Sequence, residues 1–578
     1  MLKGALRGAV LLVAVLAILP FLPSLDGRFL NWDDGINFLT NQGFRGLGSA
    51  QLRWMATTTL LGHWVPLTWL SLGVNYALAG LDPWGYHAGN LLLHSANAAV
   101  FYVIARRLLA AAWGAGVPEA ALTGGAVFAA LIFAVHPLRV ESVAWITERR
   151  DLLSGFFFLL AVCFYLRAVS EAATPRPGWR ALSLVAFAAA LMSKASTLML
   201  PGVLVLLDVY PLGRCGPLGR RGRGLVILVR EKLAYLALAA LAAVIAVIAL
   251  RSGWAMTSYG EVGFPGRLAL MTYSFTFYPW TWLWPVGLSP MYELPAAVRP
   301  LEWRFLAPLA IFPLVTLALI ALRRRWPAGL AAWVYSALMV LPVSGAAHAG
   351  FQMAADRYSY LSGLGFALLA GGAPILLQQA AASGRLRHGL AVALMVTAAA
   401  VVVALGADTW RQSRLWNDSE TLWRWAVGVD PGCALCHNNL GSALAVGAPS
   451  SPDAIAEAEA HFRRAILLRP ERDEPYNNLG GTLALQGRLD ESAAAFEAFL
   501  KRRPNVGSAW ASLGSVYVRQ GRFGDAIPPL QRSLQLNPGL ESARRDLALA
   551  LDRQAQADRG QAPADRGQAP ADRGKTRQ

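Results

Sequence analysis

The sequence predicts an all-α protein in which a polytopic membrane helix bundle precedes an α-solenoid. Hydrophobic residues make up 55% of the 578 residues and charged residues only 15%, whereas soluble chains are nearer one-quarter charged. Long apolar runs recur up to Leu405, and a 34-residue period follows them. This composition excludes a soluble enzyme, a coiled coil and a disordered scaffold for most of the length.

Eleven apolar runs predict about eleven membrane spans, because a span must satisfy its backbone polar groups within its own segment. The runs are Gly8–Phe21, Tyr86–Ile104, Leu122–Val135, Leu152–Leu166, Ala181–Met192, Leu198–Leu207, Leu233–Leu250, Phe305–Leu322, Leu330–Val343, Tyr360–Leu377 and Leu390–Leu405. We interpret the first run as an uncleaved anchor, because no A-x-A-like cleavage site follows it. Residues 1–407 are therefore expected to form one membrane domain.

Basic clusters predict the orientation, because Lys and Arg are enriched in cytoplasmic loops. The formal net charge is +17, and no basic, aromatic-interleaved module indicates a nucleic-acid partner. The clusters expected inside are Arg106-Arg107, Arg176 with Arg180, the run Arg214–Lys232, Arg323–Arg325, and Arg385 with Arg387. An odd number of crossings satisfies them all if the aromatic stretch Tyr273–Trp284, with Pro279 inside it, is re-entrant or interfacial. Everything after residue 407 is then extracytoplasmic.

The C-terminal region repeats with the tetratricopeptide period. Trp510-x2-Leu513-Gly514-x2-Tyr517, followed by Ala526 and Pro538, matches that pattern, and about three copies fit residues 408–553. Trp416–Val429 is expected to cap one end of the array and Leu540–Arg553 the other. Stacked repeats form a concave groove for a protein or peptide partner. The tail, residues 554–578, is of low complexity and is expected to be disordered.

The four cysteines argue against a disulfide framework. Cys433-Ala-Leu-Cys436-His437 spells the c-type haem attachment motif. However, these residues fall on the first helix of a repeat, at positions that such repeats fill with small and apolar side chains. We interpret them as repeat residues.

The loop after the first span carries two adjacent acids, Asp33 and Asp34. Adjacent carboxylates raise each other's pKa, and they suit proton abstraction or cation binding. The alternative is a helix N-cap before Ile36, for which one aspartate would be enough. Ionisable residues in or beside spans are expensive, so both acids are candidate functional residues.

Four cations at predicted outer boundaries are candidates for binding an anion: Arg149, Arg150, Lys194 and Arg357. The alternatives are ion pairs with Glu148, Asp151 or Asp356, and snorkelling to the membrane surface. His136, Glu141, His87 and Asp356 are supporting polar residues at the same boundaries. His87 lies with Asn90, His94 and Asn97 on one helix face, which favours interhelical hydrogen bonds. His63–Trp69 is interpreted as an amphipathic helix in the membrane interface.

These motifs occur in an ordered series. It runs Trp32-Asp33-Asp34, His63-Trp-Val-Pro66-Leu-Thr68, Tyr86-His87-x2-Asn90-x3-His94, His136-Pro137-x3-Glu141-x7-Arg149-x-Asp151, Ser193-Lys194, Asp356-Arg357-Tyr-x-Tyr360, and then the repeats. The series resembles the transmembrane and tetratricopeptide-repeat O-mannosyltransferases of the GT-C glycosyltransferase superfamily. The individual motifs are short, and their order carries the specificity. The composition and the short array resemble bacterial homologues.

The resemblance implies a GT-C-like bundle that catalyses inverting transfer of a sugar, with mannose as a candidate. The donor would be a polyprenyl-phosphate sugar in the lipid bilayer, and the acceptor a hydroxyl group, expected on a protein Ser or Thr bound by the repeats. One first-loop acid would be the base, Asp33 before Asp34, and the four cations would hold the phosphate. The implied location is a bacterial inner membrane with periplasmic repeats.

Two alternatives stay open at this point. The chain would be a non-enzymatic membrane scaffold or receptor if the repeats were its functional end. It would be a polysaccharide polymerase or ligase if its donor were a polyprenyl diphosphate. No metal ligand set is apparent, no cofactor is implied with certainty, and related folds differ on whether a divalent metal takes part.

Overall fold

The computed structural model describes residues 2–114, 116–169, 177–214, 221–252, 259–346 and 350–561. The chain divides into two units, Met1–Pro431 and Gly432–Gln578. The first unit therefore extends beyond residue 407. Arg176 and residues 215–220 of the predicted basic clusters lie outside the described residues, as does residue 562 onward of the predicted tail.

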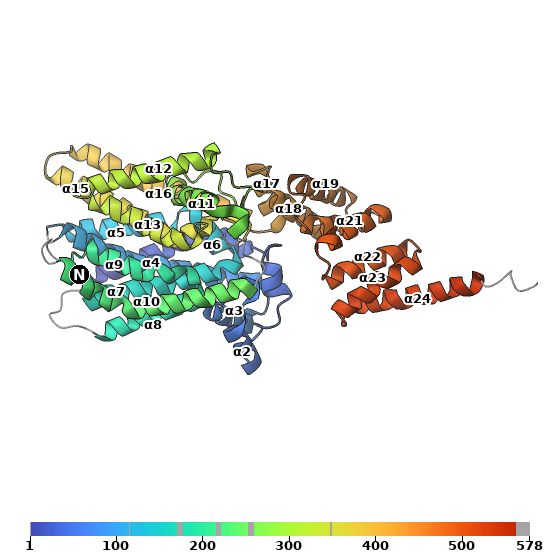
Figure 1. Ribbon diagram of the computed structural model, residues 1–578. Coiled ribbons are helices and arrows are strands. Elements are labelled where there is room, and N and C mark those ends of the chain that lie inside the picture. The colour runs from blue at the N-terminus through green and yellow to red at the C-terminus, as the bar shows by residue number, and fades with distance from the viewer. Residues whose placement is uncertain are drawn as a thin grey trace, which may run out of the picture. The chain divides into compact units, whose positions relative to one another are not determined.

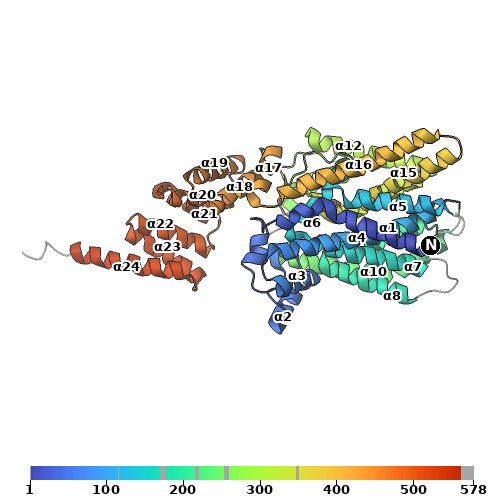
Figure 2. The same ribbon diagram turned by 180° about the vertical axis from the view of Figure 1, so that it is seen from behind.

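The first unit is a bundle of long helices that run side by side (Figures 1 and 2). The helices that build the bundle are α1 (Leu2–Ile18), α4 (Pro83–Trp113), α5 (Glu119–Ala134), α7 (Arg149–Val169), α8 (Pro177–Ser193), α9 (Leu200–Val209), α10 (Arg221–Ser252), α11 (Tyr259–Leu283), α12 (Trp303–Leu322), α13 (Pro327–Val340), α15 (Leu364–Ala382) and α16 (His388–Leu415). Apolar side chains cover them because lipid, rather than water, is the solvent that such helices meet.

Seven helices of the described chain are long and apolar enough to cross a membrane, or eight if the bent pair Glu119–Ala134 and Pro137–Ala144 is one span. The predicted multi-pass helical class is thereby confirmed. The count of eleven is not confirmed, because some predicted runs form short helices. For example, α9 has 10 residues and α13 has 14.

The aromatic stretch of residues 273–284 is almost wholly helical. Helix α11 continues through Pro279 and ends at Leu283, so this proline does not interrupt the helix. Phe275 stacks on Phe312 of α12, and Phe277 packs edge-on against Tyr292. A proline removes only one backbone bond from a helix, and aromatic packing on both sides holds this one together.

Short elements gather at the end of the bundle remote from the marked N-terminus (Figures 1 and 2). They are η1 (Leu19–Asp26), η2 (Gly35–Leu39), α2 (Ser49–Thr57), η3 (Leu60–Gly62), α3 (Pro66–Ala79), η4 (Pro137–Arg139), α6 (Val140–Ala144), η5 (Ile146–Glu148), η6 (Ala195–Met199), η8 (Leu341–Val343), η9 (Asp356–Tyr358), α14 (Ser359–Ser362) and α17 (Ser419–Val429). A short antiparallel pair, β1 (Tyr292–Glu293) with β2 (Gln352–Ala354), joins them. Helix α3 starts at Pro66, so His63 lies in the turn before it.

The second unit is a stack of helix pairs. Its helices are α18 (Ala434–Gly447), α19 (Pro452–Leu468), α20 (Glu474–Leu485), α21 (Leu489–Arg502), α22 (Gly507–Arg519), α23 (Phe523–Leu536) and α24 (Glu541–Gln561). The repeated glycines allow each pair to pack closely. A methyl group on Gly514 would come within 2.4 Å of Leu530, and one on Gly480 within 3.0 Å of Phe496. This crossing geometry explains why the glycines recur with the repeat.

Both ends of the repeat array differ from the expectation. Helix α17, predicted to cap the array, is part of the first unit. Helix α24 continues to Gln561, so the first residues of the predicted disordered tail are helical. The change in composition at Gln554 therefore does not end the helix.

A disulfide joins Cys433 and Cys436 at the start of α18. Both side chains are fully buried. The cysteine count gave no indication of this bond, because a single local pair needs only two cysteines. Cys163 is a free, buried thiol.

We predict that maleimide-polyethylene glycol labelling of the denatured, unreduced chain modifies only cysteines outside this pair. After reduction, two more sites should react. Cys433→Ser with Cys436→Ser should abolish the difference between the two samples. Equal labelling before and after reduction would show that the bond does not form.

Candidate active site

Asp34 is a buried anchor of the first loop. Its carboxylate accepts hydrogen bonds from Leu30 N (2.9 Å), Trp145 Nε1 (2.9 Å) and Thr147 Oγ1 (2.6 Å). Burial raises the pKa of Asp34 to about 7, although the Leu30 amide and Thr147 hydroxyl oppose the shift. All three donors are turned toward this one side chain, so Asp34 holds the loop and is not available to a substrate.

Asp33 is in the opposite situation. Its side chain is partly exposed, and it makes no hydrogen bond or ion pair with any residue that the structure describes. Desolvation raises its pKa above the ordinary aspartate value, while the charges of Arg150 and Arg357 act in the other direction. Asp33 is thus an accessible carboxylate beside two guanidinium groups.

The predicted cations Arg150, Lys194 and Arg357 come together around Glu148. This carboxylate is 0% exposed and lies 2.6 Å from Arg150 Nη2, 3.0 Å from Lys194 Nζ and 3.3 Å from Arg357 Nε. The three cationic side chains are 11%, 13% and 7% exposed in the same order. The cations come from α7, the α8–η6 turn and η9, which are far apart in sequence.

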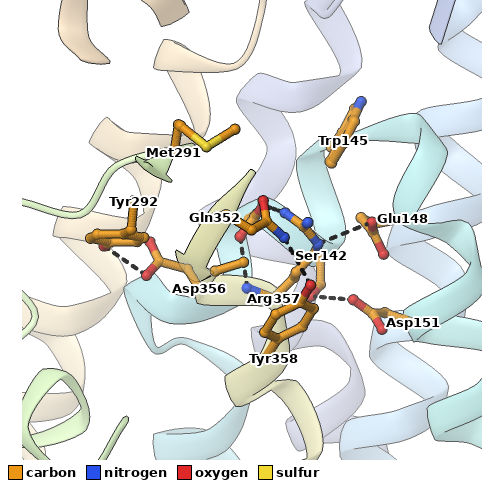
Figure 3. A network of polar contacts seen from close by, with 12 residues as sticks. Ser142, Trp145, Glu148, Asp151, Met291, Tyr292, Gln352, Asp356, Arg357 and Tyr358 are labelled. Carbon is orange, nitrogen blue, oxygen red and sulfur yellow. Dashed lines mark hydrogen bonds and ion pairs between the residues drawn. The ribbon is translucent and has the colours of Figure 1, made fainter. Parts of the chain in front are cut away.

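Further carboxylates border this cluster. Asp151 pairs with Lys194, and Glu141 pairs with Arg357 through both its guanidinium and its backbone amide. Figure 3 shows Arg357 between the helix that carries Glu148 and the short β-strands. Of the ion pairs that the sequence left as an alternative, those with Glu148 and Asp151 are therefore present and hold the cations in place, whereas no ion pair joins Asp356 to Arg357 among the described residues.

Two guanidinium nitrogens in the cluster keep a donor available. Arg150 Nη1 and Arg357 Nη2 have no hydrogen-bond partner among the described residues. Neither nitrogen belongs to the fully buried polar atoms that lack a partner, so both can be reached. Arg357 also lies near the rings of Trp145 and Tyr358, at 5.6 and 5.1 Å. An anionic ligand would find preorganised, partly desolvated donors here.

Asp356 lies on the far side of Arg357. Tyr292 Oη donates to its carboxylate over 2.9 Å (Figure 3). Burial, together with the charge of Glu141, raises the pKa of Asp356 well above its ordinary value. Asp356 thus links η9, which also carries Arg357, to β1.

Arg149 does not join the cluster. Its guanidinium donates to Asn75 Oδ1 and Tyr86 O, each over 2.7 Å, and also to Asn90 Oδ1. The side chain is buried, and these contacts link α7 to α3 and α4. Its geometry is that of an interhelical tie.

The two predicted supporting histidines also lie outside the cluster. His87 is buried beneath Gly27, where a methyl group would come within 2.7 Å of its Nε2. His136 Nδ1 caps η4 by accepting from Leu138 N, while its Nε2 contacts Trp282 O over 2.9 Å. Both histidines pack the region around the site.

Two site residues were not predicted. The sequence indicates Glu148 only as an ion-pair partner of arginine. Its position next to Arg149-Arg150 is the feature from which its place in the site could have been predicted. Desolvation, together with the charges of Arg150 and Lys194, lowers the pKa of His63 to about 3, so its ring is neutral at pH 7. The turn before it is unusual, because Leu61 has φ 53°. Among the described residues, no group of three or more His, Cys, Asp or Glu could hold a metal ion.

Comparisons with known proteins identify relatives. The tetratricopeptide repeat family model matches residues 453–505 and 486–541. Protein O-mannosyl-transferase TMTC4 of Homo sapiens is 27% identical over 497 residues, which cover 76% of this chain and 64% of the relative. Protein O-mannosyl-transferase TMTC1 of Homo sapiens is 24% identical over 534 residues, 82% of this chain and 56% of the relative.

The chain is a homologue of the protein O-mannosyl-transferases over most of its length, which confirms the resemblance inferred from the motif order. It spans less than two-thirds of the length of these relatives. Among solved structures, ArnT from Cupriavidus metallidurans bound to undecaprenyl phosphate is similar, with a TM-score of 0.36 and 19% identity over 87% of this chain and 80% of that one.

We predict that alanine substitution of the two adjacent acids affects stability to very different extents. Asp34→Ala leaves buried donors without an acceptor and should lower the free energy of unfolding of the first unit by at least about 2 kcal/mol. Asp33→Ala removes no hydrogen bond and should change it by less than about 0.5 kcal/mol. Thermal unfolding in one detergent measures both. A larger loss for Asp33→Ala would contradict these assignments.

Proposed function

We propose that the chain is a membrane glycosyltransferase of the GT-C type. It moves a sugar, with mannose as the first candidate, from a polyprenyl-phosphate donor to a hydroxyl group of a protein, with inversion at the sugar carbon. The observation that carries the proposal is that Asp33, whose carboxylate has no hydrogen bond or ion pair among the described residues, lies close enough to Arg150 and Arg357 for their charges to act on it, and that these two cations meet Lys194 at Glu148. A base beside an anion-binding cluster is what this reaction requires.

The chemistry follows from the charges. Asp33 accepts the proton of the acceptor hydroxyl as its oxygen forms a bond to the anomeric carbon of the sugar. The bond from that carbon to the donor phosphate breaks on the opposite face, and its electron pair leaves with the phosphate. Arg150, Lys194 and Arg357 stabilise the charge that develops there, so no general acid is needed. Asp34 keeps the loop in place, and Arg149 is left out of this assignment.

The distribution of basic residues supports an extracytoplasmic site. Helix α4 begins at Pro83 near the acid loop, where Tyr86 packs on Phe29, and carries Arg106 and Arg107 toward its other end. Helix α7 likewise begins at the cation cluster, and near its other end Tyr165 lies in a network with Lys232. The positive-inside rule puts the arginine-rich ends in the cytoplasm. The Cys433–Cys436 disulfide favours an oxidising compartment, such as the periplasm, for the repeats.

A lipid-linked donor is compatible with the bundle. A cavity of about 450 Å³ between α4, α7, α9, α13 and α15 is lined mainly by apolar side chains such as Phe101, Phe158 and Leu368. Such a cavity suits a hydrocarbon chain. The repeat unit supplies a second surface, and the stacked pairs of α18 to α24 are the type of scaffold on which peptides bind.

We predict that Asp33→Asn abolishes transfer while leaving the chain folded. The purified protein in nanodiscs would be given polyprenyl-phosphate mannose and an acceptor peptide, and product formed would be measured by mass spectrometry. The loss should be at least about 100-fold, because a general base contributes that much. The wild-type rate should also fall as the pH drops through the raised pKa of Asp33, since only the ionised carboxylate accepts the proton.

Two controls make that experiment decisive. Parallel assays with diphosphate-linked donors test the polymerase alternative, and assays with and without EDTA test for a divalent metal. A wild-type protein that binds peptides but transfers no sugar from any donor would support a scaffold and overturn the proposal.

We predict a contrast between two adjacent arginines. Arg150→Gln removes a charged donor from the cation cluster and should raise the KM for the lipid donor by about 10-fold or more. Arg149→Gln removes interhelical hydrogen bonds and should lower the unfolding temperature, with the KM of the folded fraction unchanged. Steady-state kinetics and thermal unfolding of both variants test this. The reverse pattern would reassign the phosphate site to Arg149.

A further inference from the structure

The loop that carries Asp33 has no regular secondary structure between Gly27 and Leu30. Its backbone amides therefore need partners other than a regular ladder, and two amides of the loop find theirs in a distant part of the chain. Arg28 N donates to Asn417 O over 2.8 Å, and Asn31 N donates to Ser419 Oγ over 2.8 Å. Ser419 is the first residue of α17 and Asn417 lies two residues before it, almost 400 residues away in the sequence.

Helix α17 adds a side-chain contact to this loop. Trp423 is 0% exposed, and its Nε1 donates to Asn31 Oδ1 over 2.7 Å. The same indole packs edge-on against Trp32, with ring centroids 5.2 Å apart. Trp32 in turn stacks on Trp145 at 4.3 Å. The residues directly before Asp33 are thus held between α17 and the segment that carries Trp145.

The carboxylate of Asp33 has no hydrogen bond or ion pair among the residues that the structure describes, and its backbone carbonyl accepts from Asn37 N over 2.9 Å. Its position depends on Asp34, which Trp145 and Thr147 hold on one side, and on Asn31, which α17 holds on the other. If the contact with Trp423 were lost, the Asn31 side chain would lose its hydrogen bond to α17 and the backbone before Asp33 would be held less tightly, while the contacts of Asp34 and of the cations around Glu148 would remain.

We propose that Trp423 is a positioning residue that sets the carboxylate of Asp33 through Asn31. This role rests on the proposed function, because it concerns the base of that reaction. Helix α17 ends at Val429, two residues before the last residue of the first unit, Pro431. The site is therefore completed by the segment that leads into the repeats.

The test compares two tryptophans of one helix. Trp423→Phe keeps an aromatic ring but removes the N–H that donates to Asn31 and part of the buried ring that packs against Trp32, so Asn31→Ala is made beside it to remove the hydrogen bond and leave the indole intact. Trp425→Phe is the matched control, because Trp425 Nε1 donates to a different loop, at Leu288 O, over 2.9 Å. Both variants are made in the full chain, and wild type and Asp33→Asn are assayed with them. Wild-type transfer that depends on Asp33 establishes the proposed function independently of this inference.

We expect Trp423→Phe to lower kcat by about 10- to 100-fold, since a displacement of about 1 Å at a reacting group has an effect of that size. The KM for the donor should stay within about twofold, and the acid limb of the pH–rate profile should move. Asn31→Ala should have the same effect, and the double variant should lose no more than either single one. Trp425→Phe should keep the wild-type kcat.

A second measurement does not depend on activity. Hydrogen–deuterium exchange of the peptide that spans Arg28 to Trp32 should become faster in Trp423→Phe and stay unchanged in Trp425→Phe. Equal losses of kcat in both tryptophan variants would overturn the proposal. So would faster exchange of this peptide with no loss of kcat, or a donor KM that rises with kcat intact.

Discussion

The geometry of the candidate site depends most on the ion pairs that Glu148 makes with Arg150, Lys194 and Arg357. Three cations from three separate segments repel one another, and in a desolvated setting this repulsion is strong. A buried carboxylate between them offsets it, and Asp151 and Glu141 border the same group on its outer sides. The cations are therefore fixed before any ligand arrives. The phosphate of the proposed donor would meet donors that are already oriented, so little reorganisation would be needed.

The two adjacent acids have different surroundings. A carboxylate that is held by several buried donors is well placed but closed to a substrate, whereas a carboxylate without such donors is accessible but less constrained. Asp34 is the first kind and Asp33 the second, one peptide bond apart. The backbone transmits the order of the buried acid to the accessible one, and the tryptophans around them restrict the remaining freedom of the loop.

Much of this arrangement could be predicted from local patterns. The helical class and the repeats follow from hydropathy and periodicity. Charges beside apolar helices are rare, and this rarity is the reason to choose Asp33, Arg150, Lys194 and Arg357 as candidate functional residues. The distinction between Arg149 and Arg150 could not be predicted, because successive residues of a helix point about 100° apart and hydropathy does not show which direction faces the site. The role of α17 was hidden as well, since a helix that packs on a loop and one that caps a repeat have the same amphipathic pattern.

The place where the membrane unit ends has a consequence for how the two halves of such a chain can vary. The array after Pro431 can be lengthened, shortened or exchanged without touching the residues that order the acid loop. A chain cut at residue 407, where the apolar sequence stops, would lose those residues together with the repeats. Inactivity of that shorter chain would not show whether the repeats are needed, because the contacts of α17 would be missing too. A cut after Pro431 removes the repeats alone and would test their contribution separately.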